Sequence, residues 1–259
     1  MLIIESFQNR TVKKINSLKT ASRREEYGLF LVEGERLVAE ISPKTDVWKY
    51  VLAESYFNKH GYGKFDPDKT YILVDSVFGK ITETVAPQGV LAVCRQRDYT
   101  AEYVLQNTKL VCILENVTDP GNLGTIIRTA YAAGADCVVL SRGCVDLHNP
   151  KVVRATMGAI FHLPIIKDAN LADVIDILKN NGSTVFAAHL NGKNVYESGI
   201  GTKPSAILIG NEAVGLTEDA ASLADSLVKI PMPGRAESLN ASVAAGILIY
   251  ETVRRNCNE

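Results

Sequence analysis

An uninterrupted apolar run, Leu110–Leu114, is followed by a polar turn and then by a helical pattern. The turn at 115–121 carries Glu, Asn, Thr and Asp side chains, and the periodic segment that begins at Asn122 includes Arg128 in its second turn. A run that is apolar at every position is typical of a strand in a parallel sheet that is covered on both faces. A plain connection needs few polar groups, so this strand–turn–helix unit is predicted to bind a ligand.

The rest of the second half repeats this alternation. Strands are predicted at 110–114, 137–140, 184–188, 205–209 and 227–230, and helices at 122–133, 151–157, 171–180, from about 217, and at 240–255. Apolar strands that alternate with helices predict an α/β domain at 110–259, with a mostly parallel sheet and helices on both faces.

A smaller α/β domain is predicted at 1–94. Its strands are expected at 29–32, 47–53, 71–74 and 90–94, and its helices at 8–20 and 34–41. A third helix is expected from Asp75, as its N-cap, to Ile81. Residues 95–109 are largely polar and charged, and this composition indicates a linker between two domains.

The overall charge is close to neutral, but one segment is basic. With 259 residues, a net charge of −1 and 46% hydrophobic residues, the chain has the composition of a folded protein and not of a nonspecific nucleic-acid coat. Residues 1–24 hold six basic side chains and one acidic one; the basic residues are Arg10, Lys13, Lys14, Lys19, Arg23 and Arg24. This segment is either a solvated helix face or an arm that contacts phosphates.

Several kinds of site are not expected. The five cysteines form no C-x-x-C pair and the four histidines have no ligand spacing, so metal and redox sites are not predicted. No apolar run reaches the length of a membrane span, and the N-terminal residues lack the apolar core of a signal peptide. We therefore expect a cytoplasmic protein with reduced thiols, no metal and no membrane association.

Three polar loops, at 116–128, 210–216 and 231–242, follow three of the predicted strands. Ligands of open α/β sheets bind beyond the carboxyl ends of the strands, so these loops predict one shared site. Each loop alone has a simpler explanation, because glycines serve in turns and Ser238 or Asn240 could cap the last helix. The P-loop, dinucleotide and nucleophile-elbow motifs are absent from the sequence.

The three loops closely resemble motifs 1, 2 and 3 of the SpoU (TrmH-type) RNA ribose 2′-O-methyltransferases of the SPOUT superfamily. The first, N-x-x-D-P-x-N-x-G-x-x-x-R-T-A, is matched by Asn116, Asp119, Pro120, Asn122, Gly124, Arg128, Thr129 and Ala130. The second, G-N-E-x-x-G, is matched by Gly210, Asn211, Glu212 and Gly215, and the third, I-P-M-x-G-x-x-x-S-L-N-x-S-V-A, by residues 230–244. The likeness covers about 110–256, and the N-terminal unit resembles, more loosely, the RNA substrate-binding domain of many members.

This resemblance implies a fold, a cofactor and partners. The fold would be a deep trefoil knot, an exception among connections that are normally unknotted. The knot's loops would bind S-adenosylmethionine through the backbone near Gly210, Ile230 and Leu239. Relatives work as homodimers through the final helix. The basic N-terminal domain would bind structured RNA, with ribosomal RNA favoured over transfer RNA.

The resemblance also assigns roles within the loops. Arg128 is similar to the family's catalytic arginine, for which a base role has been proposed. Because a guanidinium gives up its proton reluctantly, a bidentate clamp on the target phosphate suits it better. Asn116 would orient the site, and Glu212 would either accept the ribose proton or brace the knot. Ser238 and Asn240 would form hydrogen bonds within the site or the knot.

The leading hypothesis is methylation of a ribose 2′-hydroxyl in ribosomal (23S) RNA. One alternative is a transfer-RNA 2′-O-methyltransferase. Another is a non-catalytic RNA-binding factor for ribosome assembly, which would require a damaged cofactor loop or loss of the arginine. A small-molecule α/β enzyme is a third, and the basic segment at 10–24 argues against it.

Overall fold

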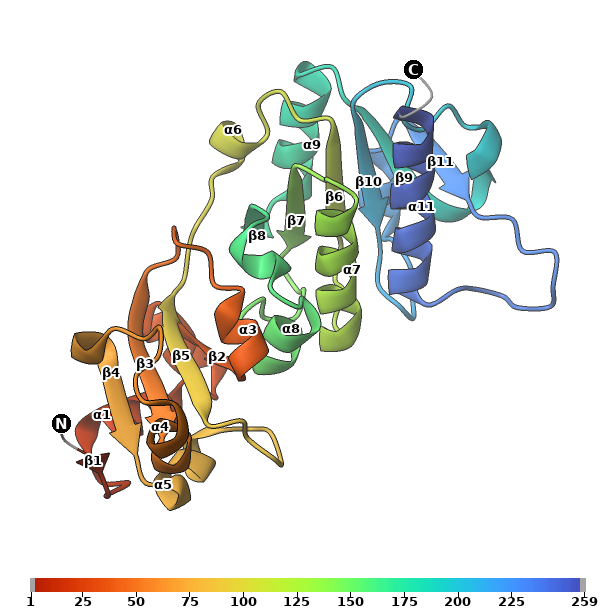
Figure 1. Cartoon of the computed structure of the whole chain (residues 1–259). Helices are drawn as coiled ribbons and strands as arrows, with labels where there is room; N and C mark the ends of the chain where they lie inside the picture. Colours follow the sequence, from red (N-terminus) through yellow and green to blue (C-terminus); the bar gives the residue numbers. More distant parts are fainter. Residues whose placement is uncertain (1–2, 257–259) are drawn as a thin grey trace. The chain divides into compact units, whose positions relative to one another are not determined.

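The computed structural model describes residues 3–256, which form two compact units (Figure 1). Unit 1 contains the residues up to Arg97 together with His148–Phe161. Unit 2 contains Asp98–Leu147 and the residues from His162 onward. Each unit has its own sheet, so the two α/β units expected from the sequence are both present.

Unit 1 is built on a mixed sheet with the strand order β1-β4-β3-β5-β2. The strands are β1 (Ile3–Ile4), β2 (Leu29–Glu33), β3 (Val47–Ala53), β4 (Thr70–Leu73) and β5 (Val90–Arg95). β4 is parallel to β1 and β3, whereas β5 is antiparallel to β3 and β2. The helices are α1 (Arg10–Ser17), α2 (Ala21–Tyr27), α3 (Glu35–Ala39), α4 (Glu54–His60), α5 (Asp75–Ile81) and α8 (Pro150–Ala155), with 3₁₀ turns η1 (Pro67–Lys69) and η2 (Ala159–Phe161).

Two apolar clusters form the core of unit 1. One includes Ile15 of α1 and Phe78 of α5, and the other includes Phe30 of β2 with Val153 of α8. Helix α8 was expected from its sequence, but as part of the alternation in the second half of the chain. Its buried face instead packs on β2, which joins residues 148–161 to unit 1.

Some local predictions were wrong or incomplete. Asp75 does not cap α5: it is the first residue of the helix, and its Oδ1 accepts hydrogen bonds from the backbone N and Oγ of Ser55 at 3.3 and 2.7 Å. Helices α2 and α4 were missed because α2 buries only Arg24 and α4 buries no residue, so neither has an apolar period. The segment expected to be a linker contains α6 (Ala101–Val104), and β8 (Ile165–Ala169) was also missed.

Unit 2 contains an all-parallel sheet with the strand order β11-β9-β10-β6-β7-β8. Besides β8, its strands are β6 (Leu110–Leu114), β7 (Cys137–Ser141), β9 (Thr184–Asn194), β10 (Ser205–Ile209) and β11 (Ser226–Lys229). Besides α6, its helices are α7 (Pro120–Ala132), α9 (Leu171–Asn180), α10 (Glu218–Ser222) and α11 (Ala241–Asn256), with the 3₁₀ turn η3 (Val195–Glu197).

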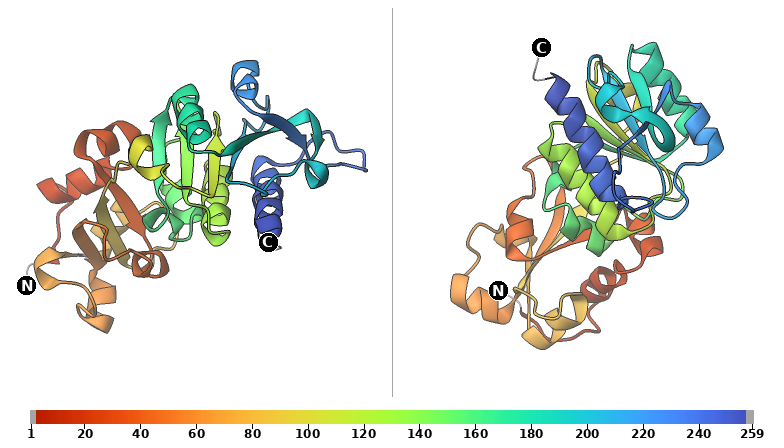
Figure 2. Two further views of the ribbon diagram at one scale, coloured as in Figure 1. Left: turned by 90° about the horizontal axis from the view of Figure 1, so that it is seen from above. Right: turned by 90° about the vertical axis from the view of Figure 1, so that its right-hand side faces the viewer.

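Helices cover both faces of this sheet, as the sequence predicted. β6 and β10 are buried at every residue. Helix α9 packs on the face that carries Val111 and Ile113, whereas α7 and α11 lie side by side on the other (Figure 2). The prediction of an α/β fold with a parallel C-terminal sheet is therefore confirmed.

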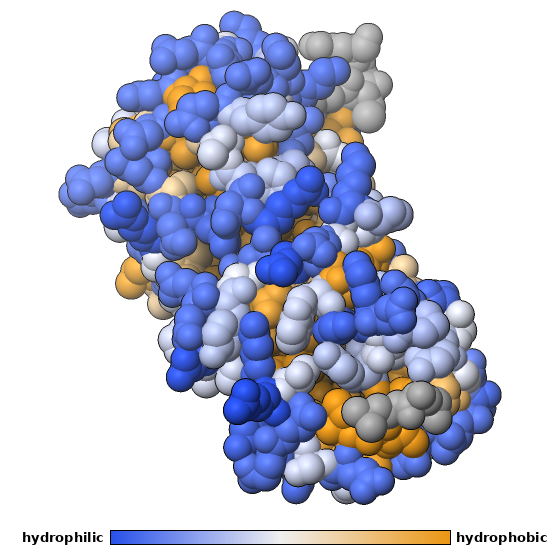
Figure 3. Space-filling view, turned by 90° about the vertical axis from the view of Figure 1, so that its left-hand side faces the viewer, coloured by the Kyte–Doolittle hydropathy of each residue, from blue (hydrophilic) through white to orange (hydrophobic). Residues whose placement is uncertain are grey.

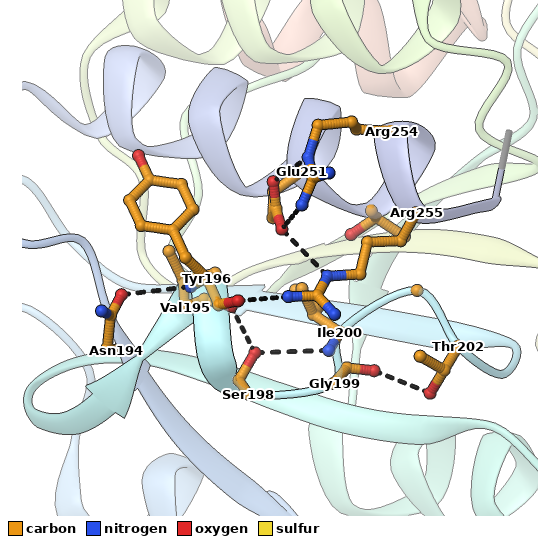
Figure 4. Close-up of polar contacts among 12 residues, drawn as sticks. Asn194, Val195, Tyr196, Ser198, Gly199, Ile200, Thr202, Glu251, Arg254 and Arg255 are labelled. Atoms are coloured by element: carbon orange, nitrogen blue, oxygen red, sulfur yellow. Dashed lines mark hydrogen bonds and ion pairs between the residues drawn. The ribbon is translucent and has the colours of Figure 1, made fainter. Parts of the chain in front are cut away.

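The last turn of α11 is fastened to the turn that follows β9 (Figure 4). The Glu251 side chain is 3% exposed and accepts hydrogen bonds from Arg254 at 2.8 Å and from Arg255 at 3.0 Å. Arg255 also donates to the carbonyl oxygen of Tyr196. A Cβ at position 201 would lie 2.6 Å from the carbonyl oxygen of Thr252, so only glycine allows α11 to approach this closely.

The described cysteines are free thiols. Burial raises the pKa of Cys94, Cys112 and Cys137 to about 12, so these three stay protonated at neutral pH. Cys257 lies outside the described residues.

Within residues 3–256, no helix combines the length and apolar character needed to cross a bilayer. In the same range, no group of three or more His, Cys, Asp or Glu side chains is placed to hold a metal ion. The face drawn in Figure 3 is mostly hydrophilic, with separate apolar patches.

Candidate active site

The loops that follow β6 and β10 are held together by the pairing of the two strands. Leu114 pairs with Ile209 at the carboxyl ends of β6 and β10, and the backbone N of Glu115 donates to the Ile209 carbonyl at 2.8 Å. One residue further on, Nδ2 of Asn211 donates to the carbonyl oxygen of Asn116 at 2.8 Å. The first two predicted loops therefore leave the same edge of the sheet in contact.

Glu212 joins the second loop to the first. Its carboxylate accepts hydrogen bonds from the backbone N of Thr118 at 3.4 Å, from the backbone N of Asp119 at 3.2 Å and from Nδ2 of Asn122 at 3.1 Å. Burial alone would raise the pKa of Glu212, but hydrogen bonds from its own backbone, from Asn122 and from the first loop outweigh burial and lower it. Glu212 is therefore an ionised acceptor at neutral pH.

Asn122 extends this connection to the third loop. Its Oδ1 accepts a hydrogen bond from Nδ2 of Asn240 at 2.9 Å. The Oδ1 of Asn240 accepts from the backbone N of Ser242 at 2.9 Å and of Val243 at 3.3 Å, and so caps α11. Asn240 thus has both roles considered for it, the helix cap and the polar link.

A cavity of about 460 Å³ lies among the loops of unit 2. Its lining includes five residues that were predicted from the sequence, one of which, Glu212, also belongs to the connecting network; the five are Gly210, Glu212, Ile230, Ser238 and Leu239. The volume and the mixture of apolar and polar groups are those of a site for a small molecule.

The segment after residue 187 also lines this cavity and was missed by sequence reasoning. Ala188, His189, Leu190 and Asn191 belong to β9, which continues to Asn194 instead of ending at 188. β9 pairs with β10 in parallel, so its predicted end lies at the same edge of the sheet as the second loop. Applying the strand-end rule to this fourth strand would have found the segment.

Gly210 has a steric reason to be glycine. A Cβ at this position would lie 2.3 Å from the backbone carbon of Gly215, closer than any real contact. Asn211 and Gly215 exchange two backbone hydrogen bonds of 3.0 Å, and Gly215 has a φ of +75°. The second loop is therefore a tight backbone turn at the wall of the cavity.

Arg128 and Asn116 do not line the cavity. Arg128 is exposed on α7, forms no ion pair with any residue in the described range 3–256, and is not among the residues that line the cavity. Asn116 is half-buried and has a φ of +53°. Its side chain packs against Gly143, since a Cβ added to that glycine would lie 2.4 Å from Oδ1 of Asn116. The structure thus brings Glu212, Ser238 and Asn240 to the cavity and network, but it keeps Arg128 apart.

Glu115 is a polar group that sequence reasoning passed over. It is 7% exposed, and its carboxylate accepts hydrogen bonds from the backbone N and Oγ1 of Thr217 at 2.9 and 2.7 Å. These bonds tie the end of β6 to the start of α10. A glutamate directly after a fully buried strand was the available signal, since a buried carboxylate needs donors.

The six basic residues of the N-terminal segment do not form one arm. Arg24 is 3% exposed and donates to the carbonyl oxygens of Leu18 and Lys19, so its guanidinium is part of the core of unit 1. Lys19 donates to the carbonyl oxygens of Lys80 and Thr82 at the end of α5. The other four behave differently: Arg23 pairs with Glu26, Lys14 lies over two aromatic rings, and Arg10 and Lys13 are exposed.

Two family profiles match the chain, one in each half. The SpoU rRNA Methylase family matches residues 109–250, and the MRM3-like substrate binding domain matches residues 9–92. Together with the three motif loops, these matches confirm the family that the sequence resembled.

Relatives of similar length support the same assignment. The chain is 36% identical over 252 residues to the 23S rRNA (guanosine(2553)-2′-O)-methyltransferase RlmP of Bacillus subtilis. The aligned region covers 95% of this chain and 97% of that protein. It is also similar to the AdoMet-bound rRNA methyltransferase of Sinorhizobium meliloti, with 33% identity, a TM-score of 0.87 and coverage of 98% and 97%.

A third relative is the SpoU methyltransferase AviRb of Streptomyces viridochromogenes in complex with AdoMet, with 26% identity, a TM-score of 0.86 and coverage of 96% and 99%. The family profile, the motif loops and the full-length relatives agree. The chain belongs to the SpoU family of S-adenosylmethionine-dependent RNA 2′-O-methyltransferases, and it carries an N-terminal MRM3-like substrate-binding domain.

Proposed function

We propose that the chain methylates the ribose 2′-oxygen of a guanosine in 23S rRNA. The observation that carries this proposal is the joining of three motif loops, by Glu212, Asn122 and Asn240, beside a cavity of about 460 Å³. The near full-length similarity to an enzyme named for a 23S rRNA guanosine supports the choice of substrate. This substrate would place the work of the protein in the cytoplasm.

The cavity fits S-adenosylmethionine. Its apolar residues, including Ile230, Met232 and Leu239, suit the adenine ring, and the side-chain-free backbone at Gly210 offers hydrogen-bonding groups at the wall. His189 adds a polar edge: its Nδ1 accepts a hydrogen bond from the backbone N of Asn191 at 3.2 Å. When bound, the cofactor supplies an electrophilic methyl group on sulfur together with a good leaving group.

Arg128 would act on the RNA and not on the cofactor. Its guanidinium is exposed and unpaired among residues 3–256, so its planar fork is available for a phosphate oxygen pair. Holding the phosphate beside the target ribose orients the 2′-hydroxyl and stabilises the negative charge that develops on its oxygen. We therefore assign Arg128 the role of a phosphate clamp and not that of the base that accepts the ribose proton.

Glu212 would brace the site. Its carboxylate already accepts hydrogen bonds from the first loop and from Asn122, and its lowered pKa makes it a weak proton acceptor. Asn116, packed against Gly143, would hold the first loop in shape. Ser238 lines the cavity, where its hydroxyl is free to bond to the cofactor or the ribose.

We propose that unit 2 has the trefoil knot of its family. The contacts that support the knot join segments far apart in sequence, because Asn122 bonds to Asn240 across 118 residues and to Glu212 across 90. The packing of α11 against α7 would close the knotted segment.

A homodimer is the proposed assembly. The exposed or half-exposed residues Val243, Ile247 and Tyr250 recur at helical spacing on α11 and would form the contact. Ala241 and Leu248 of the same helix are buried within unit 2.

Methyl transfer from labelled S-adenosylmethionine tests the proposed reaction. Ribosomal and transfer RNA fractions from cells that lack this gene are the substrates, and Arg128→Ala is assayed beside the wild type. Label in 23S rRNA that maps to a ribose 2′-oxygen and is lost in the variant is the expected result. Label in the transfer-RNA fraction would contradict the substrate, and no label in any fraction would contradict the enzyme.

A further inference from the structure

Unit 1 carries lysines and aromatic rings side by side on one part of its surface. Nζ of Lys14 lies 4.5 Å from the ring centre of Tyr27 and 4.9 Å from that of Trp48, and Nζ of Lys49 lies 5.0 Å from that of Tyr71. All five residues are half-exposed, and the three rings pack against one core cluster. We refer to these five residues as the lysine–aromatic strip.

Lysines over aromatic rings recur in unit 1. Besides Lys14 and Lys49, Lys64 lies over Phe65 and Lys80 over Phe7. The charge is also uneven. Lys and Arg outnumber Asp and Glu by 17 to 12 in unit 1, and are outnumbered by 11 to 17 in unit 2.

We propose that the lysine–aromatic strip binds unpaired nucleotides of the RNA substrate. The bases would stack on Trp48 and Tyr27, and the ammonium groups of Lys14 and Lys49 would move from the rings to the phosphates. A ring face that attracts a cation also stacks on a base, and a lysine is long enough to serve a ring or a phosphate. This inference rests on the proposed function, because it names the part of the RNA that unit 1 recognises.

The geometry favours unpaired over paired RNA. Half-exposed rings reach a base only when that base is splayed out of a helix, and the bases of an A-form duplex are stacked on each other. Lys49 is positioned by a second contact, since its Nζ donates to the carbonyl oxygen of Asp68 at 3.0 Å. The strip also gives Lys14, one of the basic residues expected to contact RNA, an aromatic setting that the sequence did not show.

Trp48 provides a direct test because it is the only tryptophan in the chain. The full-length protein is titrated with a single-stranded RNA of about 12 nucleotides and with the same RNA annealed to its complement. We expect saturable quenching of tryptophan emission by the single strand and little quenching by the duplex at equal phosphate concentration. Absence of quenching by the single strand overturns the inference.

Variants separate the strip from general charge. Lys14→Gln should weaken single-strand binding. It should also reduce the slope of log K against log salt concentration by about one, the effect of one lost phosphate contact. Lys64→Gln is the matched control, because Lys64 lies over Phe65, which belongs to the other core cluster. Measured with labelled RNA, Trp48→Leu should weaken binding about tenfold and Trp48→Phe should largely restore it. Equal binding by Lys14→Gln, Lys64→Gln and Trp48→Leu would refute the strip.

The same preparations are assayed for methyl transfer to 23S rRNA, which separates the two proposals. If the wild type transfers methyl groups but the strip variants bind RNA as the wild type does, the proposed role of the strip is overturned and the proposed function stands. Saturable quenching without methyl transfer overturns the proposed function and leaves the strip.

Discussion

Nδ2 of Asn240 donates a hydrogen bond to Oδ1 of Asn122 at 2.9 Å, although 118 residues separate the two side chains. Nδ2 of the same Asn122 side chain donates to Oε1 of Glu212 at 3.1 Å. One asparagine thus connects the start of α7, the turn after β10 and the cap of α11. A substitution at Asn240 should therefore weaken cofactor binding in the cavity, even where α11 keeps its structure.

Asn240→Asp tests this link separately from the helix cap. An aspartate oxygen still caps α11, but it has no N–H to donate and sets oxygen against Oδ1 of Asn122. We expect S-adenosylmethionine to bind about fivefold to tenfold more weakly, the effect of one lost hydrogen bond of about 1 kcal/mol. Calorimetric titration with the cofactor measures this. Asn240→Ala should in addition lower the melting temperature, and equal affinity in wild type and Asn240→Asp would exclude the link.

Glu212 gives a prediction for pH. Burial acts to raise its pKa, but the hydrogen bonds that it accepts lower it below the ordinary value of 4.5. Its stabilising contribution is therefore fully present above that value and is lost as the pH falls through the lowered pKa. Glu212→Gln should reduce stability at pH 7 and show a smaller further loss between pH 5 and 3 than the wild type. Denaturation curves measured at several pH values test this. If the unfolding free energies of the two proteins fall by the same amount between pH 5 and 3, the stabilising role of ionised Glu212 is contradicted.

Arg128 should affect turnover without affecting the fold. Because the side chain is exposed, Arg128→Lys and Arg128→Ala should change stability by less than about 0.5 kcal/mol. Loss of a group that stabilises developing charge costs about 100-fold or more in kcat, and we expect this even for lysine, which lacks the planar fork. Methyl transfer at saturating RNA, together with a thermal melt, checks both parts. Near-normal turnover by Arg128→Lys would rule out the clamp.

The parts of the fold that could be predicted are those with a local pattern. β6 and β10 are apolar and buried at every residue, so their sequences alone predict a covered parallel sheet. Helix α4 buries no residue, so no pattern marks it. Helix α8 was expected as a helix, but its packing on β2 depends on residues more than a hundred positions away, and no local pattern encodes such a partner.

The site divides in the same way. The motif positions Gly210, Glu212 and Asn240 could be named from the sequence, because the three loops follow strand ends and resemble family motifs. Their connections could not, since hydrogen bonds across 90 and 118 residues depend on the tertiary fold. Lys14 is a similar case: its charge was visible in the sequence, but its position over the rings of Tyr27 and Trp48 was not.

Gly210 should tolerate no side chain. An added Cβ would lie 2.3–2.4 Å from backbone atoms of Gly215 and Leu216, which cannot move without opening the turn. We expect Gly210→Ala to lower stability by about 1–3 kcal/mol and to weaken cofactor binding. Gly234→Ala is a suitable control, because a Cβ there meets nothing within 4 Å. If the two variants melt at the same temperature, the close approach at Gly210 does not exist in solution.

The two arginines at the end of α11 should differ in importance. Both donate to the buried carboxylate of Glu251, but only Arg255 also reaches the carbonyl oxygen of Tyr196 and so joins the helix to the turn after β9 (Figure 4). Arg255→Ala should therefore speed hydrogen exchange in the last turn of α11 and lower the melting temperature. Arg254→Ala should do neither, because Arg254 is largely exposed and a second donor to Glu251 remains. Equal loss in the two variants would mean that Glu251 needs both donors and that the bond to Tyr196 adds nothing.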